Sequence, residues 1–195
     1  MKIDISFDDG HQLDLRTMDL LKKHDLTAIF FIPILSWGFS NLKRYKGFQV
    51  GCHTFSHPMD LKQLSDDELR FEVVDSKRML EKEWGSTLEW FCPPRGRGDE
   101  RVKKQVLDAG FDRYRTTLVG CTSYDECFTV NTTVHMCPRG EYGDVGVVEY
   151  ARKCMDEAKK NPRGYFHLWG HSQEIYQLNY WAELEEILIM IKNEL

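Results

Sequence analysis

The segment Thr27-Ala-Ile-Phe-Phe-Ile-Pro33 is apolar at almost every position. A strand with only one buried face would alternate apolar with polar residues, so this run predicts a strand that is buried on both faces. An amphipathic stretch at 13–24 precedes it, and a second short apolar run at 48–52 follows it. This succession of strands and helices favours an α/β fold with a parallel sheet.

The same alternation continues along the rest of the chain. Ser65-Asp-Asp-Glu68 is a capping box that predicts the start of a helix ending near Gly85. Further helices are expected at 99–110, 147–160 and 181–192, and further strands at 3–5, 88–92, 114–119, 130–136 and 165–169. About seven strands joined by right-handed crossovers predict a distorted or incomplete parallel (β/α) barrel, in which active sites lie at the carboxyl ends of the strands.

Length and composition favour one globular domain over residues 1–195. The chain is 42% hydrophobic, which is enough for one substantial core, and it has no linker-like segment or internal repeat. A net charge of -5 and the lack of a long basic patch argue against nucleic acid as a partner. No apolar run is long enough to cross a bilayer, so no membrane partner is expected.

The cysteines and the N-terminal sequence indicate in which cellular compartment the protein is expected. The six cysteines have neither metal-knuckle spacing nor the density of a disulfide framework. Strand sequence begins at residue 2 or 3, which leaves no room for a signal peptide. These features predict a reduced, cytoplasmic protein; a chain from which a leader had been removed would instead be secreted.

Polar residues gather where predicted strands end. Asp8 and Asp9 follow the first strand, and His53 and His57 follow the strand at 48–52. An Asp-Asp-Gly turn or a pair of histidines is commonplace alone, but the carboxyl ends of parallel strands converge on one edge. One aspartate and two histidines form a facial set for a divalent metal, and the other aspartate can then take a proton from water. The pattern predicts a metal-dependent hydrolase.

Two motifs carry a resemblance to a known family. Ser6-Phe-Asp-Asp-Gly10 resembles the Thr-Phe-Asp-Asp-Gly signature of the polysaccharide deacetylases, the group of carbohydrate esterases that includes the nodulation-type chitooligosaccharide deacetylases. His53-Thr-Phe-Ser-His57 matches that family's second motif, His-Ser/Thr-x-x-His. The resemblance implies that Asp9, His53 and His57 bind the metal and that Asp8 is the general base. Two imidazoles and one carboxylate suit Zn, although Co, Ni, Mn and Fe accept the same set.

The third family motif, usually Arg-Pro-Pro-Tyr-Gly, is altered to Cys92-Pro-Pro-Arg-Gly96. In the family the arginine orients the base aspartate, which Cys92 cannot do, so either Arg95 or Arg115 is expected to supply that charge. The backbone N–H of Arg95, after Pro94, is expected to help bind the oxyanion, because that task needs no particular side chain. The fourth motif, an aspartate and tryptophan pair, is not recognisable, and Asp112 is interpreted as a solvated charge.

The fifth motif places the acid histidine at the end of the last strand. In Tyr165-Phe-His-Leu-Trp-Gly-His171 the two histidines would lie about 13 Å apart along a strand, too far to serve one reacting centre. Because Gly170 marks the strand end, His171 is predicted to be the general acid that protonates the leaving amine, with His167 orienting a neighbour or lining the pocket. Glu174 is predicted to fix the tautomer of the acid and raise its pKa.

Aromatic residues are dense over 165–181, and such rings stack on sugars. Trp169 is the candidate for substrate binding, whereas core packing is expected for most of the others. We therefore expect a metal-dependent enzyme that removes acetyl groups from N-acetylated sugars, with a small-molecule or oligosaccharide substrate. The alternatives are a hydrolase of the same fold that opens a cyclic amide or imide, and a binding protein with an inactive site.

Overall fold

The computed structural model describes residues 1–195 and contains one curled, fully parallel sheet of eight strands in the order β6-β5-β4-β3-β2-β1-β8-β7. The strands are β1 (Lys2–Asp8), β2 (Ile29–Ile32), β3 (Gln49–Cys52), β4 (Trp90–Phe91), β5 (Arg113–Arg115), β6 (Thr129–Val130), β7 (Val134–His135) and β8 (Tyr165–Gly170). The predicted distorted parallel barrel is confirmed.

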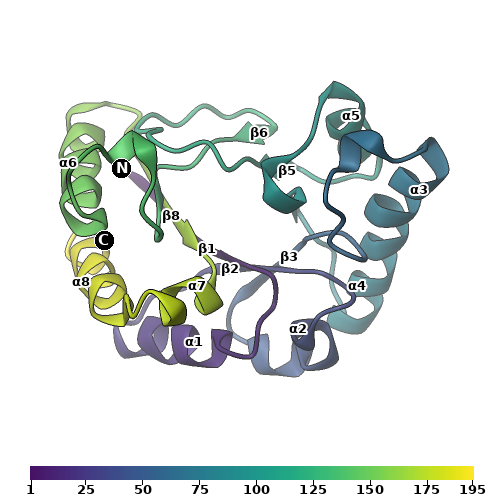
Figure 1. The fold of residues 1–195 in the computed structure, drawn as a ribbon, viewed down its shortest axis with the longest axis horizontal. Coiled ribbons are helices and arrows are strands. Elements are labelled where there is room, and N and C mark those ends of the chain that lie inside the picture. Colours follow the sequence, from purple (N-terminus) through teal and green to yellow (C-terminus); the bar gives the residue numbers. More distant parts are fainter.

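Helices surround most of the sheet, while the side between α5 and α6 carries loops and the short strand β6 (Figure 1). The helices are α1 (Asp14–Lys23), α2 (Trp37–Ser40), α3 (Asp66–Arg70), α4 (Ser76–Trp84), α5 (Glu100–Asp108), α6 (Val147–Lys160), α7 (Ser172–Gln177) and α8 (Trp181–Lys192). Short 3₁₀ turns are η1 (Leu42–Tyr45), η2 (Leu61–Gln63), η4 (Pro94–Gly96) and η5 (Gly140–Tyr142), and η3 (Phe71–Asp75) is a π-helical turn.

Strand β2 is buried on both faces, as its apolar sequence predicts. Phe30 pairs in register with Phe7 of β1, and their rings stack at 5.7 Å in the core beneath the helices. Ile29 and Phe31 point the other way and join Tyr165 in a second, smaller cluster. Because β1 lies between β2 and β8, residues from both ends of the sequence meet at the centre of the sheet.

Two expected strands have different bounds from those predicted. The strand expected at 114–119 ends at Arg115, and the one expected at 130–136 is divided into β6 and β7. The division arises because the intervening backbone changes partners: the Thr132 N–H donates to the Leu118 carbonyl and the Thr133 N–H donates to the His167 carbonyl. This stretch therefore carries the chain from one edge of the sheet to the other.

The capping box at Ser65 is confirmed, since Ser65 and Glu68 bond reciprocally at the start of α3. The helix it opens is interrupted by η3 before continuing as α4 and ending at Gly85, whose φ of 84° is left-handed. Helix α7 was not predicted. None of the helices combines the length and apolar character needed to cross a membrane, and all six cysteines are free.

Candidate metal centre

The two aspartates lie in a tight turn at the carboxyl end of β1. Asp8 is the last residue of the strand, and Asp9 and Gly10 adopt left-handed φ values of 79° and 58°. A Cβ at Gly10 would lie 2.8 Å from Ser36 Oγ, so only glycine fits there. The turn separates the two carboxylates and gives them different neighbours.

Asp9 faces two imidazoles. Its Oδ1 lies 3.5 Å from His53 Nε2 and 3.3 Å from His57 Nε2, yet this oxygen is buried and has no hydrogen-bond partner. Ligand atoms about 2.0–2.1 Å from a tetrahedral Zn²⁺ are themselves separated by about 3.3 Å. An orphaned carboxylate oxygen and two imidazole nitrogens at this spacing fit a divalent cation.

Neighbouring groups orient His53 and Asp9, two of the candidate metal ligands. His53 Nδ1 lies 2.7 Å from the carbonyl oxygen of Cys92; because a carbonyl only accepts, Nδ1 carries the hydrogen and Nε2 presents its lone pair to the centre. Gln173 Nε2 donates to Asp9 Oδ2 at 2.6 Å, which leaves Oδ1 as the oxygen that faces the histidines. Sequence reasoning missed Gln173, which lies on the unpredicted helix α7.

The loop that carries both histidines is held by Glu72, a second residue that sequence reasoning missed. Its buried carboxylate accepts hydrogen bonds from the backbone N–H groups of Phe55 and Ser56, each at 2.9 Å. Thr54 and His57 adopt left-handed φ values of 71° and 58°. Such backbone is maintained only where surrounding contacts enforce it, and Glu72 supplies them from the π-helical turn η3.

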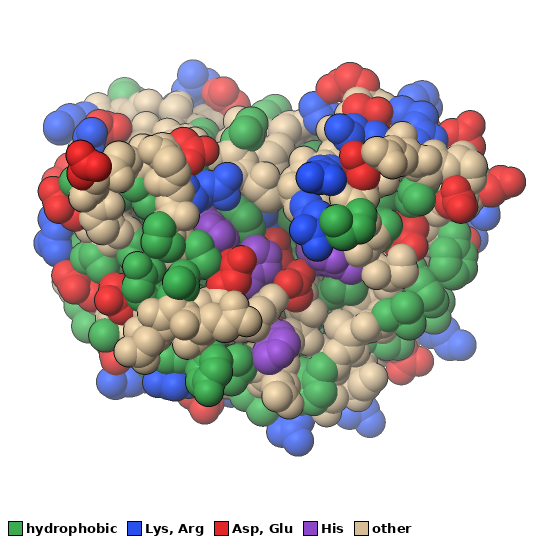
Figure 2. Space-filling model, viewed as in Figure 1, with side chains coloured by type: hydrophobic (Ala, Val, Ile, Leu, Met, Phe, Trp, Pro, Cys, Tyr) green, Lys and Arg blue, Asp and Glu red, His purple; other side chains and the backbone are tan.

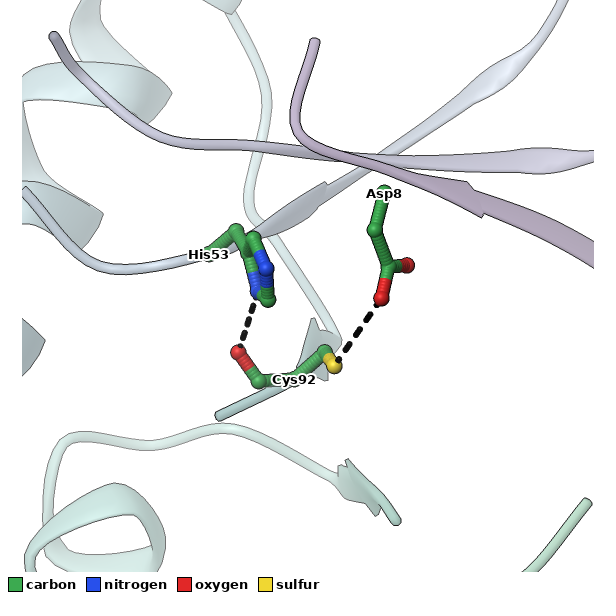
Figure 3. A group of neighbouring side chains, drawn as sticks. All are labelled: Asp8, His53 and Cys92. Atoms are coloured by element: carbon green, nitrogen blue, oxygen red, sulfur yellow. Dashed lines mark hydrogen bonds between the residues drawn. The ribbon is translucent and has the colours of Figure 1, made fainter. Parts of the chain in front are cut away.

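Asp8 forms a buried ion pair with Arg115. Arg115 Nη2 donates to Asp8 Oδ1, and both side chains are buried. Burial would raise the pKa of Asp8, but the charges of Arg115 and His53 outweigh it and hold that pKa below its usual value. Cys92 lies between Asp8 and His53, with its Sγ 3.7 Å from Asp8 Oδ2 (Figure 3).

Of the two arginines expected to replace the missing motif arginine, the structure places Arg115 beside Asp8, the predicted base. Arg95 is exposed, at a left-handed φ of 58°, while Pro94 is buried. Trp169 is only 3% exposed and lies under the site, where the Arg115 guanidinium stacks on its ring at 4.4 Å. Its ring therefore offers little surface for a sugar and packs against the guanidinium instead.

His171 lies next to Asp8 and contacts Glu174 through its other ring nitrogen. His171 Nε2 is 4.0 Å from Asp8 Oδ2, and its Nδ1 is 2.6 Å from Glu174 Oε2. Burial opposes the imidazolium, but the hydrogen bond to Glu174 and the charges of Asp8 and Asp9 raise the pKa of His171 to about 9. The ring is therefore protonated at neutral pH and stands next to the predicted base.

His167 lies elsewhere. It is fully buried on β8, in register with Asp4, and its ring nitrogens contact Ser6 Oγ and Tyr165 Oη at 2.9 Å each. Burial lowers its pKa well below the usual histidine value, so the ring is neutral. Asp112, near which the fourth motif was sought, is exposed. At the centre of the face in Figure 2, histidine and carboxylate side chains gather together.

The parallel barrel, with histidine and carboxylate side chains gathered at its strand ends, is shared with a known protein family. The family model for polysaccharide deacetylases matches residues 2–114, and the chain belongs to that family. Peptidoglycan-N-acetylglucosamine deacetylase of Bacillus cereus is 30% identical over 116 residues, which cover 56% of this chain and 42% of that protein. Chitin deacetylase 1 of Cryptococcus neoformans is 31% identical over 133 residues, covering 65% of this chain and 27% of that protein. The chain thus spans less than half the length of these relatives.

Known structures share the fold at low identity. The Xyl-CE4 domain of a multidomain xylanase from the hindgut metagenome of Trinervitermes trinervoides aligns with a TM-score of 0.64 and 15% identity, covering 98% of this chain and 83% of that one. A family 4 carbohydrate esterase pseudoenzyme from Bacillus anthracis aligns with a TM-score of 0.61 and 21% identity, covering 98% of this chain and 60% of that one. A family 4 acetyl xylan esterase from Clostridium thermocellum, in complex with a cobalt ion, aligns with a TM-score of 0.57 and 18% identity. The alignment covers 87% of this chain and 73% of that one.

Proposed function

We propose that this chain is a metal-dependent deacetylase that hydrolyses the acetamido group of N-acetylated sugars or sugar polymers. The observation that carries the proposal is the orphaned, buried Oδ1 of Asp9 between two imidazole nitrogens. Asp9, His53 and His57 would hold the ion, with Zn the preferred candidate. Family membership supports the reaction class, and the printed names of the relatives support the substrate class.

A divalent ion at that site would polarise the acetyl carbonyl and increase the acidity of a nearby water. Asp8, ionised and fixed by Arg115, is the group that takes the proton of the attacking water. His171, protonated and held by Glu174, then donates its Nε2 proton to the departing amine. The two groups are 4.0 Å apart, so they flank a single reacting centre.

Arg115 takes over the role of the arginine that Cys92 replaces. Arg115 contacts Asp8 from β5, whereas the family arginine would stand at the end of β4. Both positions can stabilise the ionised carboxylate, because the ion pair depends on where the guanidinium lies and not on the strand that carries it. Binding of the oxyanion by the backbone N–H of Arg95 is part of the proposal. A cytoplasmic location stays a prediction from the sequence.

The test is release of acetate from N-acetylglucosamine oligomers by the purified chain after chelation and addition of one equivalent of Zn²⁺. We expect turnover in the parent, and a loss of about 10²–10⁴-fold in Asp8→Asn with metal content unchanged. The double variant His53→Ala/His57→Ala should retain no stoichiometric metal. Turnover of cyclic amides without acetate release would favour the alternative hydrolase, and metal binding without any turnover would favour an inactive binding protein.

A further inference from the structure

Helix α7 carries three of the groups that the proposed reaction uses. His171 is its N-cap residue, Gln173 donates to Asp9, and Glu174 contacts the His171 ring. The helix has only six residues, and its N-cap makes no side-chain hydrogen bond to the first turn. Isolated helices this short are unstable in water, so contacts with the rest of the fold must determine where α7 lies.

Ser172 and Ile175 are the buried residues of α7. They are three positions apart and therefore share one face of the helix, while His171 and Glu174 share another. Ile175 packs in the main hydrophobic core, but apolar contacts are non-directional. The orientation of the helix therefore depends on the polar contacts of Ser172.

Ser172 is hydrogen-bonded to Asp14, the first residue of α1, across a separation of 158 residues. Its Oγ donates to Asp14 Oδ1 at 2.6 Å and lies 2.8 Å from Thr17 Oγ1. All three side chains are fully buried. A short hydrogen bond to a carboxyl group is strong and directional, so this contact fixes the first turn of α7 against α1.

The carboxyl group of Asp14 is unfavourable to bury. Its side chain contacts two hydroxyl groups and no cation: Tyr45 Oη donates to Oδ2 at 2.8 Å, and Ser172 donates to Oδ1. Burial raises the pKa of Asp14 to about 7, even though both hydrogen bonds oppose the shift. A buried carboxyl without a cation lowers stability, and carboxyls in such surroundings concentrate at functional sites.

We propose that Asp14 is a positioning residue that acts through Ser172 and holds α7 in the orientation at which His171 faces the reacting centre. This role rests on the function proposed above. Misplacing a reacting group by about 1 Å can lower a rate by about 10²-fold, even when the altered residue is remote from the chemistry. Loss of the Asp14–Ser172 bond therefore impairs protonation of the leaving amine more than a reaction that needs no acid.

The ratio of two kcat/KM values at saturating Zn²⁺ tests this role: that for an N-acetylglucosamine oligomer over that for 4-nitrophenyl acetate. A nitrophenolate leaves without protonation and an amine does not, so the ratio reports on the acid. We expect Ser172→Ala and Asp14→Leu each to lower the ratio about tenfold or more. Asp14→Asn should retain most of it, because the amide can accept from Tyr45 and donate to Ser172.

A double variant and a matched control show whether the effect passes through Ser172. Asp14→Leu combined with Ser172→Ala should lower the ratio no further than the worse single variant, since both remove the same bond. Tyr45→Phe removes the other hydroxyl from the same carboxyl group without touching α7, and it should leave the ratio unchanged. Additive losses in the double variant, or an equal loss in Tyr45→Phe, would overturn the proposal.

Backbone hydrogen exchange separates positioning from a general structural role and needs no turnover. The N–H groups of Ile175 and Leu178 donate to the carbonyls of His171 and Glu174. In Ser172→Ala these two amides should exchange faster, whereas those of α8 should keep the parent rate. Unchanged exchange in α7, or faster exchange throughout the chain, would refute the anchoring. A chain without deacetylase activity that still shows the local change would contradict the proposed function and retain the anchoring of α7 by Asp14.

Discussion

Arg115 is the residue that most departs from the family pattern, and breaking its ion pair with Asp8 should lower the unfolding free energy measurably. Both side chains are buried, so Arg115→Met would leave an unpaired carboxylate. We expect the metal-free chain to lose about 3–5 kcal/mol of unfolding free energy in urea. Adding Asp8→Asn should recover part of the loss, because the stranded charge disappears.

Arg113 provides the control for that experiment. It lies two residues away on the same strand, is partly exposed and contacts only Tyr124 Oη and a backbone carbonyl. Arg113→Met should therefore change the unfolding free energy by no more than about 0.5 kcal/mol. Similar losses in the two variants would contradict the buried pair.

His171 offers a prediction for pH. In the metal-free chain, NMR titration should place its pKa near 9, and Glu174→Gln should lower it because the largest favourable contact is removed. Since the folded pKa is raised above the usual value of about 6.5, its contribution to stability is complete below about pH 6.5 and is lost as pH rises through 9. His167 is the internal control: it should show no titration over this range. A His171 pKa that is the same in Glu174→Gln would refute the coupling.

The sequence allowed part of this site to be predicted at the level of residues. Asp8, Asp9, His53 and His57 directly follow apolar runs, and strand ends of a parallel sheet must converge. The arginine beside Asp8 was left open between Arg95 and Arg115, because the choice depends on which way each side chain points. His135, whose Nε2 lies 3.5 Å from His171 Nδ1, was missed because a lone histidine on a two-residue strand has no spacing partner in the sequence.

At the level of elements, the π-helical turn η3 positions the loop that carries His53 and His57. Glu72→Gln keeps every proposed ligand but replaces a carboxylate that accepts two backbone N–H groups. We expect metal affinity to fall about 10–100-fold, as for other groups that orient ligands, measured by competition with a chromogenic chelator.

Glu68→Gln, in the capping box of the adjoining helix α3, is the matched control. It should reduce stability slightly, by roughly 0.5–2 kcal/mol at most, and leave metal affinity unchanged because Glu68 contacts only Ser65. The sequence predicted this helix from its cap and its apolar positions. It did not predict the π turn, because the buried apolar residues Leu69, Val73 and Leu80 have the spacing of one continuous α-helix.

For the whole molecule, metal binding should add to stability because the ligands come together only in the folded chain. At a free Zn²⁺ concentration 100 times the dissociation constant, the gain is about 2.7 kcal/mol. With about 2–4 °C per kcal/mol for a chain of this size, chelation should lower Tm by roughly 5–11 °C. Differential scanning calorimetry with and without chelator measures the shift, and the Tm of His53→Ala/His57→Ala should not respond.

The overall architecture was predictable because each apolar run with its flanking turns specifies a strand, and alternation with helices leaves only parallel pairing. The exact number of strands was not predictable. The sequence at 131–133 has the pattern of a continuous strand. Its backbone hydrogen bonds to Leu118 and His167, two residues far apart in the sequence, divide β6 from β7.

The central position of β1 also determines when the candidate site can form during folding. Strand β1 pairs with β8 over six residues, and Gln173 reaches Asp9 across a separation of 164 residues. Such long-range closure costs chain entropy before any contact repays it, so folds of this kind form slowly. The segments around β2 and β3 can assemble early, but the proposed base, the proposed acid and Gln173 come together only when the last strand docks. The candidate site is therefore completed at the end of folding, after most of the sheet exists.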